Sequence, residues 1–192
     1  MNQTVLEILT EEPSMETFLQ VLLPKILPED YVVGINCFIR PHEGKSDLQS
    51  SVPKKMRAYP RYGYPVKVFI IHDQDSNNCI LLKRELQELC KISTYSTPVL
   101  IRIACRELEN WYLGDMAAIE MVYPETKASR LENKAKYRNP DNLQGHSEME
   151  FLSKKFSKSH AAREIPKYMN LENNKSISFN HFLTGLKKLI AS

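Results

Sequence analysis

The sequence predicts an α/β fold with a parallel sheet of about four strands. Four short apolar runs rich in β-branched residues are separated by segments whose apolar residues recur with helical spacing. This alternation is typical of parallel strands joined by right-handed helical crossovers. No further strand is evident after Tyr123. We therefore expect a Rossmann-like domain over residues 1–124 and a C-terminal helical appendage over residues 125–192 that packs on it.

Two pairs of strand and helix are expected in the first part of the chain. Residues 5–9 form a β-rich run, and an amphipathic helix follows that has Ser14 as its N-cap and ends near Pro28. Residues 31–39 form the second strand. Because this run is continuously apolar, we expect it to be buried on both faces of the sheet. A weaker helical pattern covers residues 48–58.

The remaining strands are expected at residues 66–71 and 99–104, with a helix over about residues 79–91 between them. Beyond the fourth strand the pattern changes to short helical segments joined by polar turns. These segments cover residues 148–156, 161–169 and 179–190. We interpret them as the appendage.

The composition is that of a globular chain that needs neither a membrane nor disulfides. A chain of 192 residues buries a core without cross-links. No apolar run reaches the roughly 20 residues that span a bilayer. The N-terminal run MNQTVLEILTEEPS lacks the basic start of a signal peptide, and we interpret it as the first strand. The cysteines form no CxxC pair, which predicts buried free thiols and a cytoplasmic protein. They are Cys37, Cys79, Cys90 and Cys105.

Charge is distributed unevenly along the chain. Residues 1–124 hold 13 Lys and Arg against 16 Asp and Glu, a net charge of −3. Residues 125–192 hold 13 against 7, a net charge of +6. A polyanion such as RNA or DNA is therefore expected to be attracted to the C-terminal third. The alternative is that these basic residues only solvate helix faces.

Acidic residues follow two of the predicted strands. Glu11 and Glu12 follow the first strand, and Asp73 and Asp75 follow the third as a D-x-D pair. Ligands of open α/β sheets bind outside the carboxyl ends of the strands, so these carboxylates are expected to share one crevice. Oxygen ligands without thiols favour Mg²⁺ or Mn²⁺. The alternative is helix capping, by Glu12 for the first helix and by Asp75 for the helix after the third strand.

The same segments resemble the motifs of TOPRIM domains. The run LTEEPSMETF is similar to their first motif, a strand that ends in a glutamate, and VFIIHDQDS is similar to their D-x-D motif. The chain more closely resembles a bacterial TOPRIM-like family related to overcoming-lysogenization-defect-type nucleases. The matching segments also include EGKSDL, IACRELENWYLGD, FSKSHAARE and NNKSISFNHFLTGLKKL.

This resemblance implies a metal-dependent nuclease that acts as a toxic effector in anti-phage defence under the control of an ABC- or SMC-like ATPase partner. Glu11, Asp73 and Asp75 match the catalytic, metal-binding positions, and Glu109 matches a further acidic position. A glycine usually follows the first glutamate, but here Glu12 takes that place. The rival interpretation is a non-catalytic interaction module that binds or restrains an ATPase.

Three basic residues are candidates for contacts with nucleic acid. Lys45 lies in a loop after the second strand, and Lys158 and His160 lie in the FSKSH turn of the basic region. Gly44-Lys45-Ser46 resembles the end of a P-loop, but Ile39 stands where that motif requires its first glycine. We therefore expect no ATP binding by this chain. The sequence leaves the formation of a homo-oligomer open.

Overall fold

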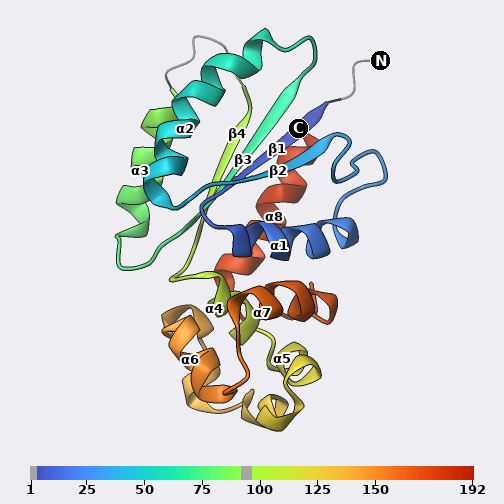
Figure 1. The fold of residues 1–192 in the computed structure, drawn as a ribbon, viewed down its shortest axis with the longest axis vertical. Coiled ribbons are helices and arrows are strands. Elements are labelled where there is room, and N and C mark those ends of the chain that lie inside the picture. Colours follow the sequence, from blue (N-terminus) through green and yellow to red (C-terminus); the bar gives the residue numbers. More distant parts are fainter. Residues whose placement is uncertain (1–3, 92–96) are drawn as a thin grey trace.

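The computed structural model describes residues 4–91 and 97–192. Its centre is a four-stranded, all-parallel sheet with the order β2-β1-β3-β4 (Figure 1). The strands are β1 Val5–Thr10, β2 Cys37–Pro41, β3 Val66–Asp73 and β4 Val99–Ala104. The predicted α/β class, with four parallel strands, covering helices and a C-terminal helix, is confirmed.

The two inner strands, β1 and β3, form the apolar centre of the sheet. Every residue of β1 is buried, and in β3 only Lys67 is more than slightly exposed. Ile8 pairs with Phe69, and Ile70 pairs with Ile101 in the next strand. Strands that are buried on both faces are continuously apolar, which explains why these two runs were predictable.

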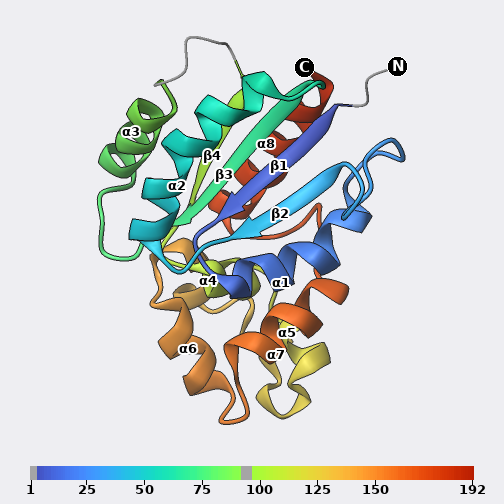
Figure 2. The ribbon, with the colours of Figure 1, turned by 45° about the horizontal axis from the view of Figure 1, so that its top comes forward.

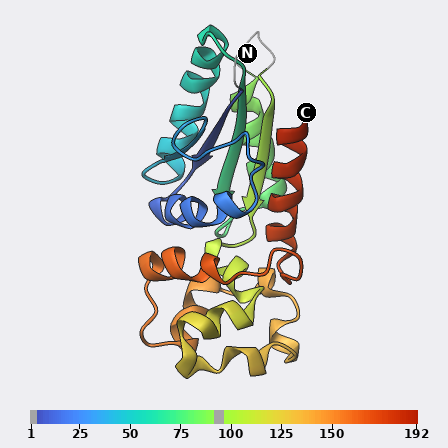
Figure 3. The same cartoon turned by 90° about the vertical axis from the view of Figure 1, so that its right-hand side faces the viewer.

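Helices cover both faces of the sheet (Figure 3). On one face α2 Lys45–Ala58 and α3 Cys79–Cys90 pack over the side chains of Leu9, Val68 and Ile70. On the other face α1 Pro13–Leu22 and α8 Ile177–Ala191 pack over a second apolar cluster. Alternate residues of a strand point to opposite faces, so a single strand contributes to both clusters.

Residues 105–176 form a helical layer beneath the carboxyl edge of the sheet (Figures 1 and 2). Its α-helices are α4 Leu108–Leu113, α5 Met116–Val122, α6 Gly145–Leu152 and α7 Lys158–Glu164. Four short 3-10 turns lie between α5 and α6, and one more follows α7. The last helix, α8, then runs back along β4 and β3 (Figure 2). The boundary at residue 124 stays a prediction, and the structure adds that this last helix packs directly on the sheet.

Trp111 joins the helical layer to the sheet domain. Its ring is fully buried, with ring centroids 5.7 Å from Phe18, 5.4 Å from Phe179 and 5.0 Å from Phe182. Its indole N–H donates to the hydroxyl of Ser178 at 2.7 Å. One side chain of α4 thus contacts both helices, α1 and α8, that cover this face of the sheet.

The prediction for the second strand was wrong in its extent and in its burial. The strand starts at Cys37, because the side chain of Asn36 bonds the N–H of Val32 and the carbonyl of Asp30 and holds the preceding residues in a turn. Gly34 in that turn has a φ of 86°. The strand lies at the edge of the sheet, and Arg40 at its end is exposed. It is therefore not buried on both faces.

Helix starts differ slightly from prediction. Helix α1 starts at Pro13 with Glu12 in the N-cap position, and Ser14 only donates its hydroxyl to the Glu12 carboxylate at 3.2 Å. Proline suits the first turn of a helix because its missing N–H needs no partner there. Across residues 4–91 and 97–192, no helix is long and apolar enough to cross a bilayer. All four cysteines are free, and of these Cys37 is fully buried.

An acidic crevice at the carboxyl edge of the sheet

The sheet reverses its direction of winding between β1 and β3. From β1 the chain passes through α1 to β2 on one side, and from β2 it returns through α2, across β1, to β3 on the other side. In open α/β sheets such a reversal leaves a crevice outside the carboxyl ends of the two strands. Glu11 directly follows β1, and Asp73 is the last residue of β3. The two predicted acidic segments therefore meet at this point.

Glu11 is held in place by its neighbours. Its carboxylate Oε2 accepts the backbone N–H of Asp73 at 3.1 Å and lies 2.7 Å from Nδ1 of His72. Nδ1 also lies 2.6 Å from the carbonyl oxygen of Asp73. Because both of these atoms are acceptors, Nδ1 carries the hydrogen and donates it. Both contacts of Glu11 use Oε2, so Oε1 is the oxygen left for a ligand.

Asp73 is the most unusual group of the crevice. Its side chain is buried, and its Oδ1 has no hydrogen-bond partner within the described part of the chain. Burial raises the pKa of the Asp73 carboxyl well above its ordinary value, and the nearby carboxylates raise it further. These are Glu11, Glu12, Glu109 and Asp75. A buried carboxylate without partners is costly, so the site is suited to a positive ligand.

Asp75 lies differently from Asp73. It sits on an exposed turn with a φ of 50°, where its N–H donates to the carbonyl of Arg106 at 2.8 Å. The strict alternation of an extended strand therefore ends before this residue. Burial and the charge of Glu11 raise the pKa of its carboxyl. The capping alternative is wrong for this residue, because Asn78 caps α3.

Glu12 and Lys158 form the rim of the crevice. Glu12 stands at the N-cap position of α1, as the capping alternative expects, but its side chain makes no capping hydrogen bond. Its carboxylate lies 3.6 Å from Nζ of Lys158 in α7. Burial alone would lower the pKa of Lys158, but Glu109, Glu12, Glu107 and Asp73 together raise it. Lys158 is thus a cation paired with the acids of the crevice rather than a free surface residue.

Glu109 reaches the crevice from the helical layer. It is buried in the first turn of α4, and burial raises the pKa of its carboxyl although Lys158 opposes the shift. Nδ1 of His146 lies 3.7 Å from its carboxylate. The neighbouring Glu107 caps α4 and also accepts the N–H of His146 at 2.7 Å. Glu109 therefore acts electrostatically on the same site as Asp73.

The three residues predicted to contact nucleic acid lie in different surroundings. Lys45, the first residue of α2, lies 3.5 Å from the side-chain oxygen of Asn77 in the turn after Asp75. It therefore stands beside the D-x-D segment. His160 is exposed and packs its ring edge-on against Tyr123. Lys45 and Lys158 thus contact residues next to the acids of the crevice, whereas the ring contact of His160 is with Tyr123.

In the conformation of the structure, the acidic side chains do not form a complete metal-coordination site. Among the residues that the structure describes, no three His, Cys, Asp or Glu side chains converge closely enough to hold a metal ion. The acids nevertheless act on one another electrostatically, because four of them raise the pKa of Asp73.

The family of the chain is shown by a match over most of its length. The family described as a domain of unknown function, DUF4276, matches residues 10–187. The chain belongs to the DUF4276 family. No curated protein and no solved structure matches it.

Several residues of this crevice carried no recognisable signal in the sequence. Glu107 and His146 meet only because α6 packs on α4. Tyr112 is fully buried and its hydroxyl has no partner among the described residues; burial, with Glu109 and Asp73, raises its pKa well above the ordinary value. His72, next to the D-x-D pair, could be found from its position, but its contact with Glu11 depends on the pairing of β1 with β3.

We predict that Asp73 makes the DUF4276 chain less stable as pH rises. A carboxyl whose pKa is raised on folding binds its proton more tightly in the folded state, so its contribution is most favourable below the unfolded pKa of about 3.9 and is lost as pH rises through the folded pKa. Without metal, Asp73→Asn should raise the free energy of unfolding by about 1–3 kcal/mol at neutral pH and by much less at pH 4. Urea unfolding at several pH values in EDTA measures this. The exposed Glu85→Gln is the control, and a benefit that shrinks with rising pH would contradict the prediction.

Proposed function

We propose that this protein is a metal-dependent nuclease that hydrolyses phosphodiester bonds of RNA or DNA. The observation that carries the proposal is the Asp73 carboxylate, which is buried at the winding reversal of the sheet with a partnerless oxygen and other carboxylates around it. Such an arrangement is costly unless a cation neutralises it. The resemblance to TOPRIM-like nucleases supports the same function.

The chemistry of the side chains fits Mg²⁺ or Mn²⁺. Glu11, Asp73 and Asp75 offer only carboxylate oxygens, which these hard cations prefer. Asp73 offers its partnerless Oδ1, and Glu11 offers the oxygen that His72 does not engage. Asp75 lies on an exposed turn and Glu109 on the opposite wall, so both would complete the site by side-chain rotation. When bound, a divalent cation supplies a Lewis acid for the phosphoryl group and acidifies a water molecule.

The chain's own residues would bind and orient the substrate. Lys45 lies beside the D-x-D turn, and Lys158 lies beside Glu12 at the rim. Both ammonium groups could therefore contact backbone phosphates of a nucleic acid bound in the crevice. His72 fixes the orientation of the Glu11 carboxylate through Nδ1. His160 stays a proposed contact at the outer end of the basic region.

The incomplete convergence of the acids favours control by a partner. We propose that an ABC- or SMC-like ATPase, as the resemblance implies, regulates this chain as a cytoplasmic effector of anti-phage defence. The same observation supports a second candidate function, a non-catalytic module that binds or restrains the ATPase. In that case the acidic crevice would make no productive metal site.

A cleavage assay tests the proposal. The purified chain is incubated with tRNA, single-stranded RNA and plasmid DNA in Mg²⁺, Mn²⁺ or EDTA, alone and with the ATPase. We expect cleavage of at least one substrate that requires metal and stops in EDTA. Absence of cleavage in every combination, with the ATPase present, would contradict the nuclease and leave the interaction module.

A further inference from the structure

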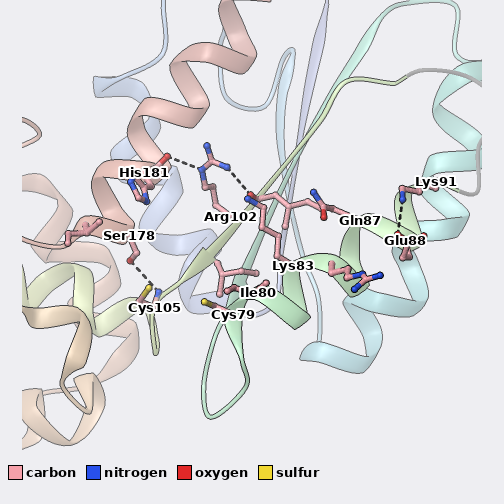
Figure 4. A pocket seen from close by; sticks show the side chains of 14 residues that line it. Cys79, Ile80, Lys83, Gln87, Glu88, Lys91, Arg102, Cys105, Ser178 and His181 are labelled. Carbon is pink, nitrogen blue, oxygen red and sulfur yellow. Dashed lines mark hydrogen bonds and ion pairs between the residues drawn. The ribbon is translucent and has the colours of Figure 1, made fainter.

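A groove runs along the free edge of β4, between α3 and α8 (Figure 4). Strand β4 pairs with β3 on one side and, in the part of the chain that the structure describes, with no strand on the other. The groove has a volume of about 1020 Å³. An edge strand left open in this way exposes backbone groups that an extended segment of another chain can use.

The groove carries positive charge. Its lining contains Lys83, Arg84, Lys91 and Arg102, and within residues 4–91 and 97–192 Glu88 is its only acidic residue. Lys91 lies 2.7 Å from Glu88 and neutralises it. The other three cations have no carboxylate within ion-pair distance in residues 4–91 and 97–192. A negatively charged partner is therefore favoured.

Arg102 is held in this groove by contacts that involve no carboxylate. Its Nε donates to the carbonyl of His181 at 3.0 Å, and Nη1 donates to the carbonyl of Ile101 at 3.0 Å. A Cβ on Gly185 of α8 would lie only 2.6 Å from Nη2, so the guanidinium packs at a distance from this helix that only a glycine allows. Glycine in the interior of a helix lowers the stability of that helix, so this packing has a cost in free energy. Burial lowers the pKa of Arg102, as expected for a cation with no anion beside it.

Aliphatic side chains make up much of the remaining surface. Ile80 of α3 is 74% exposed and Ile177 of α8 is 56% exposed, and they flank the groove on its two sides. Among the residues that the structure describes, the lining contains no Phe, Tyr or Trp. Single-stranded nucleic acids are bound largely by stacking on aromatic rings, so this surface suits them poorly. A peptide in which acidic and aliphatic residues alternate presents both kinds of side chain to the groove.

We propose that this groove binds an extended acidic segment of a partner protein, which lies along β4 and places a carboxylate on the guanidinium of Arg102. Lys83 and Gln87 extend from α3 toward Arg102 and would contact the same segment (Figure 4). The proposal does not depend on the nuclease function, because it rests on the outer edge of β4 and not on the carboxyl ends of β1 and β3.

The test uses a fluorescein-labelled peptide of alternating Glu and Val, about eight residues long so that it spans β4. Fluorescence anisotropy with the full chain in EDTA should show binding that weakens as salt is added. Arg102→Gln should weaken binding at least about tenfold, because a charge-assisted bond is lost. Gly185→Ala should also weaken binding, since the new methyl group displaces the guanidinium, while helix content measured by circular dichroism is kept or increased.

The exposed Arg61→Gln is the matched control and should bind as the wild type does. Thermal melting confirms that each variant is folded. Three results would overturn the proposal: no binding of the acidic peptide, equal binding of a Lys–Val peptide, or unchanged affinity in both Arg102→Gln and Gly185→Ala. Displacement of the peptide by oligo(dT) at lower concentration than by unlabelled peptide would assign the groove to nucleic acid instead. Because no metal enters the measurement, its failure is distinct from failure of the nuclease assay.

Discussion

Glu11→Gln and Asp73→Asn are each expected to lower the rate of metal-dependent cleavage by at least about 100-fold. Residues that only orient metal ligands contribute about 10–100-fold, so loss of a ligand charge should cost no less. Each substitution keeps the size of the side chain and removes one negative charge from the crevice. Asp73→Asn should lower the cleavage rate without lowering the free energy of unfolding, because it relieves the repulsion between Asp73 and the surrounding carboxylates.

The rates are measured under single-turnover conditions on whichever substrate the wild type cleaves. Glu85→Gln, which removes an exposed charge on α3, is the control and should retain the wild-type rate. A variant of Glu11 or Asp73 that cleaves within about threefold of the wild type would exclude the crevice as the active site, because a ligand must matter more than the groups that orient it.

Trp111→Ala is expected to lower the free energy of unfolding by about 3–5 kcal/mol. The ring is fully buried and packs against Phe18, Phe179 and Phe182, so its removal leaves a cavity between the helical layer and the sheet. It also removes the hydrogen bond that the indole N–H donates to the hydroxyl of Ser178. Since a domain is stable by only about 5–15 kcal/mol, a large part of the total would be lost.

Urea unfolding followed by circular dichroism measures this effect. Phe151→Ala is the control, because that ring is 70% exposed and its loss should change stability by no more than about 0.5 kcal/mol. A loss of less than about 1 kcal/mol in Trp111→Ala would contradict the packing described for α4, α1 and α8.

Local sequence patterns predict most of the sheet because buried strands consist of recognisable runs of apolar residues. The runs at β1, β3 and β4 are apolar and β-branched since they lie inside the sheet or against helices. The second strand was misplaced because its apolar neighbours, Val32 to Ile35, belong to a turn fixed by Asn36. A side chain that bonds the backbone several residues away is not visible in hydropathy. The packing of α8 on the sheet likewise depends on contacts with β4 far along the chain.

The candidate site was predictable only where it follows strands. Glu11 and Asp73 were found because parallel strands bring their carboxyl ends together, a rule that needs no tertiary detail. Glu107 and the ion pair between Lys158 and Glu12 arise from the fold of the helical layer, which no local pattern encodes. The D-x-D spacing also does not predict that Asp75 lies on an exposed turn with a left-handed backbone conformation.

The central claim is that the acidic crevice holds a divalent cation, and Mn²⁺ binding measured by electron paramagnetic resonance tests it most directly. Titration of Mn²⁺ into the metal-free chain should show one or two bound ions that Mg²⁺ displaces. Asp73→Asn should abolish this binding, whereas Glu85→Gln should leave it unchanged. Absence of bound Mn²⁺ in the wild type, or binding that persists unchanged in Asp73→Asn, would contradict the account.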